Sequence, residues 1–309
     1  MYQPFNSLIW INNNVFFSII ILFVTAIILY KMTPIVVKLF NLKSSINNSK
    51  NTPFKSIVEL DLESVDLKTM GLRNILKNYI FSSDLKDIDL NKRQIINTIN
   101  PHSYCVSKKD LSFKKALINS DVLLPDGFGI VLATKVLFGK HIKKIAGADI
   151  HAHLLKYANL NKKKVFYLGA SQNTLKLITK RLKKEYPNIQ VASYSPPYKL
   201  EFNSKDSKQM IDKVNTFNPD ILFVGMTAPK QEKWVQINKH SLCPKTIVSI
   251  GAVFDFYAGT VKRSNSFWIN LGLEWLPRLI KEPKRLWRRN FISTPLFLIS
   301  LGKAKLNLS

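Results

Sequence analysis

The chain has 309 residues, of which 46% are hydrophobic, so it is long enough to bury one sizeable core or two small ones. Lys and Arg number 46 against 20 Asp and Glu, and the resulting formal net charge of +26 favours an anionic partner such as nucleic acid, a lipid surface or a phosphorylated substrate. The two cysteines, Cys105 and Cys243, lie far apart in the sequence. They indicate a reducing compartment and exclude a disulfide framework or a paired-cysteine metal site.

The first thirty residues contain no charged side chain, and within them VFFSIIILFVTAIILY (Val15–Tyr30) is almost wholly apolar. About 20 apolar residues are needed to span a bilayer. The apolar run reaches this length if Leu8–Ile11 is counted with it, which requires the three asparagines between the two segments to lie near the lipid headgroups. The absence of a preceding basic region and of a small-residue cleavage site argues against a cleaved signal peptide. The segment after the apolar run contains five lysines before its first acidic residue: Lys31, Lys38, Lys43, Lys50 and Lys55. Because positively charged segments next to a membrane span tend to stay on the cytoplasmic side, the sequence predicts that the rest of the chain is cytoplasmic. The sequence predicts a single-pass membrane anchor, and the alternative is a buried helix that packs on the domain or on another subunit.

Polar residues 41–55 are predicted to link this anchor to the rest of the chain. From residue 56 on, apolar runs of strand length alternate with amphipathic stretches of helix length. Strands are predicted at residues 56–62, 93–99, 121–125, 164–170, 188–194, 220–226 and 245–251, and helices at 112–120, 174–186, 207–217 and 229–239. This alternation is typical of βαβ units and a mainly parallel sheet. After about Phe267 only helices are predicted, which divides the chain into an anchor and linker (1–55), an α/β core (56–266) and a basic helical appendage (267–309).

Polar and glycine residues gather where the predicted strands end. In open α/β sheets ligands bind beyond the carboxyl ends of the strands, so this edge is the predicted site. Glycine there allows a ligand to approach the backbone, and the following helix N-termini offer N–H groups to phosphates. The residues concerned are Thr98–Pro101, Asp126–Gly129, Gly169–Ser171, Gly225–Thr227 and Gly251.

Familiar motifs for phosphate and metal binding do not occur in the chain. It contains neither G-x-x-x-x-G-K-[ST] nor G-x-G-x-x-G, and no H-E-x-x-H. His151 and His153 point to different helix faces, so they have no ligand spacing. No structural metal is predicted.

Two short stretches contain the polar residues of greatest interest. In LLPDGFG (Leu123–Gly129), Asp126 ends a predicted strand beside glycines. It is interpreted as the cap of the next helix, as a general base, or as a group that positions a sugar hydroxyl. In TAPKQEKW (Thr227–Trp234), Gln231 and Glu232 lie in the first turn of a predicted helix. They are either ordinary N-terminal helix residues, with the acid complementing the helix dipole, or an amide and an acid that face a polar ligand.

The appendage combines positive charge with aromatic side chains. From Arg278 to Lys305 there are eight Lys or Arg residues and one acid, Glu282. Aromatic residues accompany them, namely Trp275, Trp287, Phe291 and Phe297. Such a basic, aromatic helix is typical of binding to a membrane surface or nucleic acid, and the planar fork of arginine suits a diphosphate. A merely solvated basic face is the alternative.

Five motifs occur in one order: PDGFGIV (125–131), GKHIKKIAGAD (139–149), PKQEKW (229–234), FDFYAG (254–259) and GLEWLPRLIKEPKRLWRR (272–289). Together, over residues from about Ile57 to Phe291, they resemble the bacterial WecG/TagA/CpsF glycosyltransferase family. The resemblance implies a Rossmann-like α/β core with helices on both faces and a helical C-terminal appendage. It also implies inverting transfer of an N-acetylmannosamine-type sugar from a UDP donor to a polyprenyl-diphosphate-linked sugar at the cytoplasmic membrane face, in cell-surface polysaccharide synthesis. No metal or other cofactor is implied.

The resemblance also assigns roles to individual residues. Asp126 falls on the proposed catalytic base. Substrate-binding positions are matched by Thr98, Asn100, Gln231, Arg278, Arg285 and Arg288, with the arginines closing over the site to hold the donor diphosphate. We also expect substrate contacts from Gly127, Gly129, Lys144, Asp149, Gly169 and Glu232. Two positions depart from the family pattern: Lys144 replaces an arginine, which keeps the charge but loses bidentate geometry, and Ala252 replaces the second glycine of G-G-x-F-D-F.

The expected partners are a UDP-sugar, a polyprenyl-diphosphate-linked acceptor and the membrane, whereas nucleic acid is not expected. The identities of both sugars and of the polymer stay open, as does assembly into a homo-oligomer. One alternative is a transferase of the same fold that uses another hexose donor. The other is a membrane-tethered, non-enzymatic binder of nucleic acid or another anionic polymer, whose affinity falls steeply with salt and does not depend on Asp126.

Overall fold

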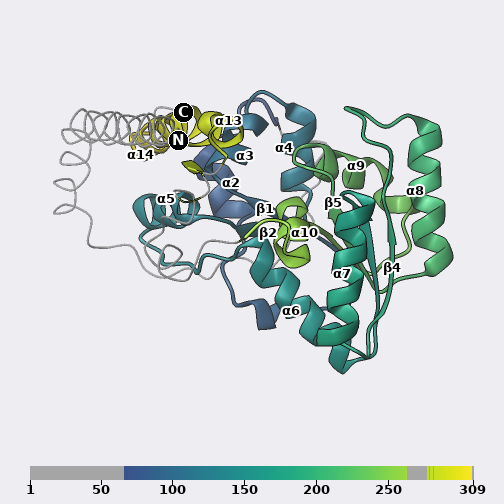
Figure 1. Ribbon diagram of the computed structural model, residues 1–309. Coiled ribbons are helices and arrows are strands. Elements are labelled where there is room, and N and C mark those ends of the chain that lie inside the picture. Colours follow the sequence, from purple (N-terminus) through teal and green to yellow (C-terminus); the bar gives the residue numbers. More distant parts are fainter. Residues whose placement is uncertain (1–65, 263–276, 278, 281, 308–309) are drawn as a thin grey trace, which may run out of the picture. The chain divides into compact units, whose positions relative to one another are not determined.

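A computed structural model of the chain describes residues 66–262, 277, 279–280 and 282–307, except the side chain of Arg285. Six strands form one sheet in the order β2-β1-β6-β5-β3-β4, and each neighbouring pair is parallel (Figure 1). The strands are β1 (Gln94–Ile99), β2 (Val122–Pro125), β3 (Lys164–Gly169), β4 (Gln190–Tyr194), β5 (Ile221–Gly225) and β6 (Thr246–Ser249). The predicted parallel α/β sheet is confirmed.

The predicted membrane anchor, the strand at 56–62 and the boundary at 266–267 all lie outside the described residues. Within the described ranges, no helix is both long enough and apolar enough to cross a bilayer.

The helices that flank the strands include the predicted ones, as α4, α7, α8 and α9, and several that were not predicted. They are α2 (Leu72–Asn78), α3 (Pro101–Ser107), α4 (Leu111–Ile118), α5 (Phe128–Phe138), α6 (Gly147–Leu160), α7 (Gln172–Glu185), α8 (Ser204–Phe217), α9 (Lys230–Asn238) and α10 (Gly251–Ala258). The C-terminal part comprises α13 (Pro283–Trp287), the π-helical turn η5 (Arg288–Ser293) and α14 (Thr294–Lys305). Single 3₁₀ turns lie at η3 (Leu85–Asp87) and η4 (Lys239–Ser241).

Helices cover both faces of the sheet because the central strands are apolar on both sides, as is typical of parallel sheets. Successive side chains of β3 point to opposite faces. Val165 and Tyr167 enter one buried cluster with α6, α7 and α10, whereas Phe166 and Leu168 enter another with α8 and α9. The molecule is therefore a three-layer αβα arrangement.

A third buried cluster lies at the β2 edge of the sheet and includes the C-terminal helix. Residues of α2, α3, α4 and α5 pack there with Phe297, Leu301 and Ala304 of α14. The ring of Phe297 meets that of Tyr104 edge to face, with centroids 5.7 Å apart. Arg73 Nη1 donates a hydrogen bond to Ala304 O at 3.1 Å. Helix α14 is therefore an integral part of a buried core.

The strand order places helices on opposite faces of the sheet at the carboxyl ends of the central strands. Strand β1 is followed along the chain by its neighbour β2, but its other neighbour is β6. Helix α3, which follows β1, packs against α4 and α14, whereas α10, which follows β6, packs against α6 and α7 on the other face. The helices that follow the neighbouring strands β1 and β6 thus lie on opposite faces of the sheet. Such a switch point is where ligands bind in open α/β sheets.

Candidate active site

The ends of β1 and β2 bring Asn100 and Asp126 together. The register pairs Thr98 with Leu124, and Asp126 N donates to Ile99 O at 2.9 Å, so the two strands end side by side. Asn100 Nδ2 lies 3.5 Å from Asp126 Oδ2 and donates to it. The side chains of Thr98, Asn100 and Asp126 are all half-buried. The site thus has a carboxylate that is fixed by its strand and oriented by a neighbouring amide.

Asn100 is oriented in turn by its role as the N-cap of α3. Its Oδ1 accepts hydrogen bonds from His102 N and Ser103 N, both at 3.0 Å, and Ser103 Oγ accepts from Asn100 N at 2.8 Å. This reciprocal cap, with Pro101 at the first helical position, starts α3 directly after β1. Because the cap occupies Oδ1, the Nδ2 group points to Asp126.

Asp126 lies one residue before the N-cap of the next helix, α5. The N-cap of α5 is Gly127, and this N-cap makes no side-chain hydrogen bond to the helix. Asp126 therefore precedes the cap position, and the capping residue at this sheet edge is Asn100. Gly127 has φ 91°, a conformation that side chains with a Cβ rarely adopt, and it turns the chain from β2 into α5.

Gly129 and Gly169 have packing reasons for being glycine. A Cβ at Gly129 would lie 2.5 Å from Pro101 Cγ and 3.5 Å from Phe297 Cε1, so this glycine allows α3 and α14 to pack on α5. A Cβ at Gly169, where φ is 117°, would collide with the carbonyl oxygen of Gly225 on β5. The predicted contacts of both glycines with substrate stay predictions.

The loop before α6 places Lys144 beside the end of β2. Ile145 N donates to Pro125 O at 3.0 Å, which ties the loop to the strand. Asp149 Oδ2 accepts from Ala146 N at 2.9 Å and so caps the start of α6. Lys144 and Asp149 are both half-buried. Lys144 thus lies near the Asn100–Asp126 pair along the same strand end, whereas Asp149 has a structural role that its sequence position did not reveal.

Gln231 and Glu232 point inward from the first turn of α9. Gln231 Oε1 accepts from Met226 N at 3.1 Å, and Gln231 Nε2 donates to Glu232 Oε1 at 2.9 Å. Only 4% of Gln231 and 3% of Glu232 is exposed. A Cβ at Gly251 would lie 2.7 Å from Gln231 Oε1, so the amide also packs against the start of α10. The two side chains form a buried link beneath the β5–α9 turn, and their predicted contact with ligand stays a prediction.

The environment of Glu232 penalises its ionised form. Burial raises the pKa of this carboxyl to about 7, although the hydrogen bond from Gln231 opposes the rise. Its second oxygen, Oε2, is buried without a hydrogen-bond partner among the described residues, as is Ser249 Oγ at the end of β6. A carboxyl that keeps its proton can donate a hydrogen bond from this oxygen, which an ionised one cannot.

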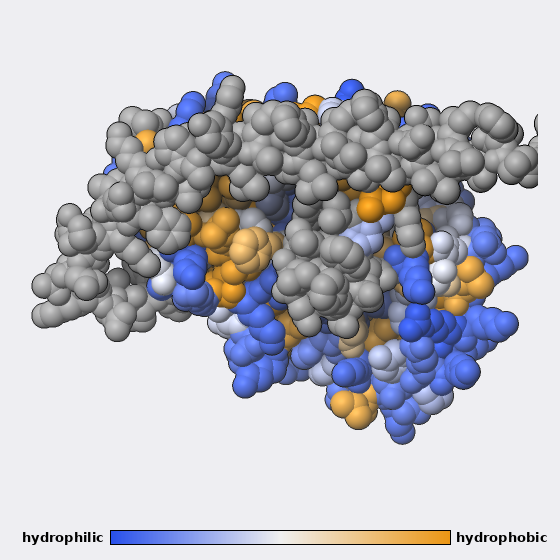
Figure 2. Space-filling view, turned by 60° about the vertical axis from the view of Figure 1, so that its left-hand side comes forward, coloured by the Kyte–Doolittle hydropathy of each residue, from blue (hydrophilic) through white to orange (hydrophobic). Residues whose placement is uncertain are grey.

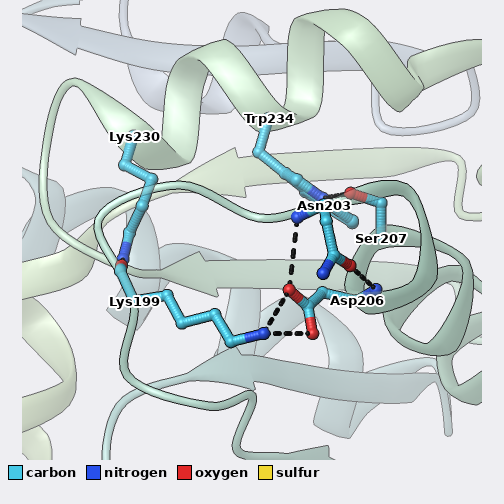
Figure 3. Close-up of polar contacts among 6 residues, drawn as sticks. All are labelled: Lys199, Asn203, Asp206, Ser207, Lys230 and Trp234. Carbon is cyan, nitrogen blue, oxygen red and sulfur yellow. Dashed lines mark hydrogen bonds and ion pairs between the residues drawn. The ribbon is translucent and has the colours of Figure 1, made fainter.

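Two other residues of the motif PKQEKW, Lys230 and Trp234, contact α8 and the loop before it (Figure 3). Lys230 Nζ donates to Lys199 O at 2.7 Å, and Lys199 Nζ contacts both oxygens of Asp206, at 3.0 and 2.8 Å. Trp234 Nε1 donates to Ser207 Oγ at 3.2 Å. Lys230 and Trp234 thereby join the start of α9 to the β4–α8 loop and to α8. Lys230 and Trp234 of the motif PKQEKW therefore stabilise the position of α9 beside the strand ends.

A family model described as the WecG/TagA/CpsF family of glycosyl transferases matches residues 72–309. The chain belongs to this glycosyltransferase family. Among curated relatives, the N-acetylglucosaminyldiphosphoundecaprenol N-acetyl-beta-D-mannosaminyltransferase of Bacillus subtilis (strain 168) is 35% identical over 214 residues, which cover 69% of this chain and 80% of the relative. Proteins of the same name from Bacillus spizizenii (35% over 209 residues; 67% and 78%) and Staphylococcus aureus strain MW2 (29% over 210 residues; 68% and 80%) are also similar.

The arginines that the resemblance places in the glycosyltransferase site are only partly described. Arg278 and the side chain of Arg285 lie outside the described residues. Arg288 begins the π-helical turn η5 and is exposed. No three His, Cys, Asp or Glu side chains in the described part of the glycosyltransferase are grouped so that they could hold a metal ion.

No pattern in the sequence indicates the contact between η5 and α3. His102 Nδ1 lies 2.8 Å from Ser293 Oγ in a hydrogen bond, and Cys105 Sγ donates to Ser293 O at 3.3 Å. The pKa of His102 is lowered by burial and, secondarily, by the positive charge of Arg289. His102 and Cys105 are separated from Ser293 by 191 and 188 positions, so only the fold of this glycosyltransferase shows that they meet.

Proposed function

We propose that this glycosyltransferase moves an N-acetylmannosamine-type sugar from a UDP donor to a sugar carried by a polyprenyl diphosphate, with inversion at the anomeric carbon. The names of the Bacillus and Staphylococcus relatives support the transferred sugar and the lipid-linked acceptor. The single observation that carries the proposal is the Asn100–Asp126 pair, because it places an oriented, half-buried carboxylate at the strand ends of a sheet that is built to bind ligands there.

In the proposed reaction the acceptor hydroxyl oxygen attacks the anomeric carbon, and the bond from that carbon to the UDP oxygen breaks. Asp126 takes the proton of the hydroxyl as the new glycosidic bond forms. UDP leaves with the electron pair of the broken bond. A single displacement of this kind inverts the anomeric configuration. Asn100 supports the step because its N–H donates to Asp126 Oδ2 and favours the ionised carboxylate.

The departing diphosphate gains negative charge, which positively charged side chains of the protein would stabilise. Lys144 lies at the end of β2 beside the proposed base, and Arg288 is exposed on η5. Cations that are held in place before the reaction stabilise developing charge without having to reorganise. We propose that Lys144 and the appendage arginines together hold the leaving group.

We also propose that the enzyme works at the cytoplasmic face of the membrane, where its acceptor lies, with residues 1–55 as the anchor. The C-terminal segment supports this location, because large apolar side chains recur on its exposed surface: Trp287, Ile292, Leu296 and Ile299. Their spacing follows one side of a helix, and Lys303 extends the row. On the face drawn in Figure 2, hydrophilic residues cover most of the lower part and hydrophobic ones gather in a few patches.

The test measures UDP release by purified full-length enzyme from a panel of UDP-sugars, with and without a polyprenyl-diphosphate-GlcNAc acceptor. We expect acceptor-dependent release from UDP-N-acetylmannosamine and a fall of about 10²-fold or more in Asp126→Asn, a typical loss for a general base. Asp212→Asn, at an exposed position of α8, is the matched control and should retain activity. The anomeric configuration of the product, measured by NMR, tests inversion.

Other outcomes separate the alternatives. Turnover by Asp126→Asn at the wild-type rate would remove Asp126 from the role of base. Release from a different UDP-hexose would favour the same-fold transferase with another donor. No release from any donor, together with tight binding of an anionic polymer that weakens steeply with salt, would favour the non-enzymatic binder.

A further inference from the structure

Glu232 is a buried acid that lies one hydrogen bond away from the carboxyl ends of the central strands. Its Oε1 accepts from Gln231 Nε2 at 2.9 Å, and Gln231 Oε1 accepts at 3.1 Å from the backbone N–H of Met226, the first residue after β5. A Cβ at Gly251 would lie 2.7 Å from the same Gln231 Oε1, so the amide also packs against the start of α10. Glu232 therefore determines which way this amide faces, because Nε2 must point to the carboxyl and Oε1 to the backbone N–H.

The Gln231 amide lies close to the switch point of the sheet. Gly251 begins α10 two residues after β6, the neighbour of β1, and β1 is followed directly by Asn100. The N-cap of α10, Ile250, makes no side-chain hydrogen bond, so it does not occupy the first N–H groups of the helix. A donor that binds across the ends of β1 and β6 therefore lies close to Gln231 and to the carboxyl that orients it.

Glu232 has no counter-ion among the described residues. Helix α9 packs against α4, η4 and β6, and it also contacts α8 and the start of α10. Strand β6 contains no titratable residue. The titratable side chains of α9 and of these neighbours that are not exposed are Lys230, Lys233, Lys239, Asp110, Lys114, Asp206, Asp255 and Tyr257. All of them bond to other groups except Lys239, which lies at the far end of α9.

The interior beside Glu232 is polar but suits a neutral carboxyl. Its Oε2, Ser249 Oγ and Asn97 Oδ1 are all buried without a hydrogen-bond partner among the described residues. Ile247 and Ile95 enter the buried cluster under α8 and α9, so Ser249 and Asn97, two residues further along the same strands, face the same side of the sheet. This side offers oxygen acceptors to a protonated carboxyl, whereas an ionised one finds no described cation there.

A negative charge on Glu232 would oppose the binding of an anion at the strand ends. At an effective dielectric constant of about 20, two unit charges about 10 Å apart change each other's equilibrium constants by about tenfold or more. Neutral Glu232 avoids this repulsion and still accepts the hydrogen bond from Gln231. The same carboxyl thus has one form that is compatible with an anionic ligand and one that disfavours it.

We propose that binding of the donor is coupled to protonation of Glu232, because the neutral side chain orients Gln231 without placing a negative charge beneath the diphosphate. This inference rests on the proposed use of a UDP donor. Glu232 is a positioning residue, because it acts through Gln231 and through its own charge and touches no reacting atom. The coupling is reciprocal: donor binding favours the protonated carboxyl as much as protonation favours the donor.

The experiment measures binding of UDP-N-acetylmannosamine to the full-length enzyme in detergent. Calorimetry at pH 7.5 in buffers of different ionisation enthalpy gives the number of protons that binding takes up. The diphosphate of this donor is esterified at both ends, so its charge stays constant over the pH range used. With a tenfold coupling and a pKa of about 7 for Glu232 in the free enzyme, binding should take up about half a proton per donor. The wild-type Kd should rise about five- to tenfold between pH 6 and pH 8.5.

Glu232→Gln imitates the neutral carboxyl at every pH, because it keeps an acceptor for Gln231 Nε2 and cannot ionise. Its Kd should equal that of the wild type at pH 6 and be about five- to tenfold lower at pH 8.5, with the half-proton uptake abolished. A gain in affinity is a result that damage to the fold does not produce. Glu232→Met, which removes the acceptor, should bind the donor more weakly than the wild type at pH 6. Glu201→Gln, at an exposed position, is the matched control and should keep the wild-type pH dependence.

A histidine is the rival source of the proton. His141 is exposed and lies three residues before Lys144, so an anionic donor near Lys144 would also favour its charged form. His141→Gln should retain the uptake of about half a proton. Loss of the uptake in His141→Gln, together with normal uptake in Glu232→Gln, would overturn the inference.

The readouts also separate this inference from the proposed function. Binding of a different UDP-hexose with the same Glu232-dependent proton uptake would contradict the N-acetylmannosamine donor and retain the inference. If UDP-N-acetylmannosamine binds with the same Kd at pH 6 and pH 8.5, in the wild type and in Glu232→Gln alike, the inference fails and the donor stands. Binding of no UDP-sugar to the wild type would contradict both.

Discussion

Replacing Glu232 with glutamine is expected to make the fold more stable at alkaline pH. The glutamine keeps the shape of the side chain, and its Oε1 can still accept from Gln231 Nε2. What changes is that no charge forms in the buried site. In the wild type, burial raises the pKa of the carboxyl from its ordinary value of 4.5 to about 7. The folded state therefore binds the proton more tightly than the unfolded state, and folding stability falls as the pH rises between these two values.

The size of the effect follows from the two pKa values. They differ by about 2.5, and each whole unit corresponds to about 1.4 kcal/mol. Above pH 7 the free energy of unfolding of the wild type is therefore lower by about 3 kcal/mol than it is below pH 4.5, owing to this one group. The Glu232→Gln enzyme lacks this loss.

The assay is equilibrium urea unfolding of full-length enzyme in detergent at pH 5 and pH 8, followed by tryptophan fluorescence. The stability difference between Glu232→Gln and the wild type should shift in favour of the variant by about 2 to 3 kcal/mol between the two pH values. Glu201→Gln, which changes an exposed glutamate, should show no comparable shift. If the difference between Glu232→Gln and the wild type is the same at both pH values, Glu232 ionises in the folded enzyme as it does in the unfolded chain, and the reasoning fails.

Two further predictions concern the packing around α14. Gly129→Ala places a methyl group 2.5 Å from Pro101 Cγ, so α3 must shift, and urea unfolding should show a loss of about 1–3 kcal/mol. Phe297→Ala removes a side chain that is 1% exposed in the third cluster, and it should cost about 3–5 kcal/mol in the same assay. Unchanged stability of Gly129→Ala would mean that α3 does not pack closely on α5 in solution. Unchanged stability of Phe297→Ala would mean that α14 is not docked in the third cluster.

The sheet was predictable from the sequence because its strands are apolar on both faces. Runs such as those at 164–170 and 220–226 stand out without reference to any partner, and they became β3 and β5. Helices α3, α5 and α10 were missed because they start directly at strand ends. Helix α5 is also mostly apolar around its circumference, so it lacks the periodicity that identifies an amphipathic helix. Their existence depends on caps and on burial by neighbours, and not on a local pattern.

The gathering of polar and glycine residues at one edge of the sheet was also predictable, but the contacts that each of these residues makes were not. Asp126 and Asn100 were recognisable at strand ends, yet their contact required the β1–β2 register. Gly129 and Gly169 were both interpreted as making room for a ligand. The atoms that a Cβ would meet belong to α3, α14 and β5, which are distant in sequence. The burial of Glu232 likewise depends on the helices packed around α9, so its sequence position indicated a helix start and nothing about its pKa.

The appendage packs into a buried core and is proposed to bind the diphosphate, and its complete removal would affect both functions together. One side of α14 supplies Phe297, Leu301 and Ala304 to a buried cluster, so deletion of the segment would expose that cluster and weaken the fold itself. The side chain of Arg288 is exposed and that of Arg289 is half-buried, and neither belongs to that cluster. Loss of activity after truncation would therefore not distinguish a missing diphosphate ligand from a damaged core. Substitution of the arginines alone, with the buried side of α14 intact, separates the two roles, because affinity for a diphosphate can then change while the free energy of unfolding does not.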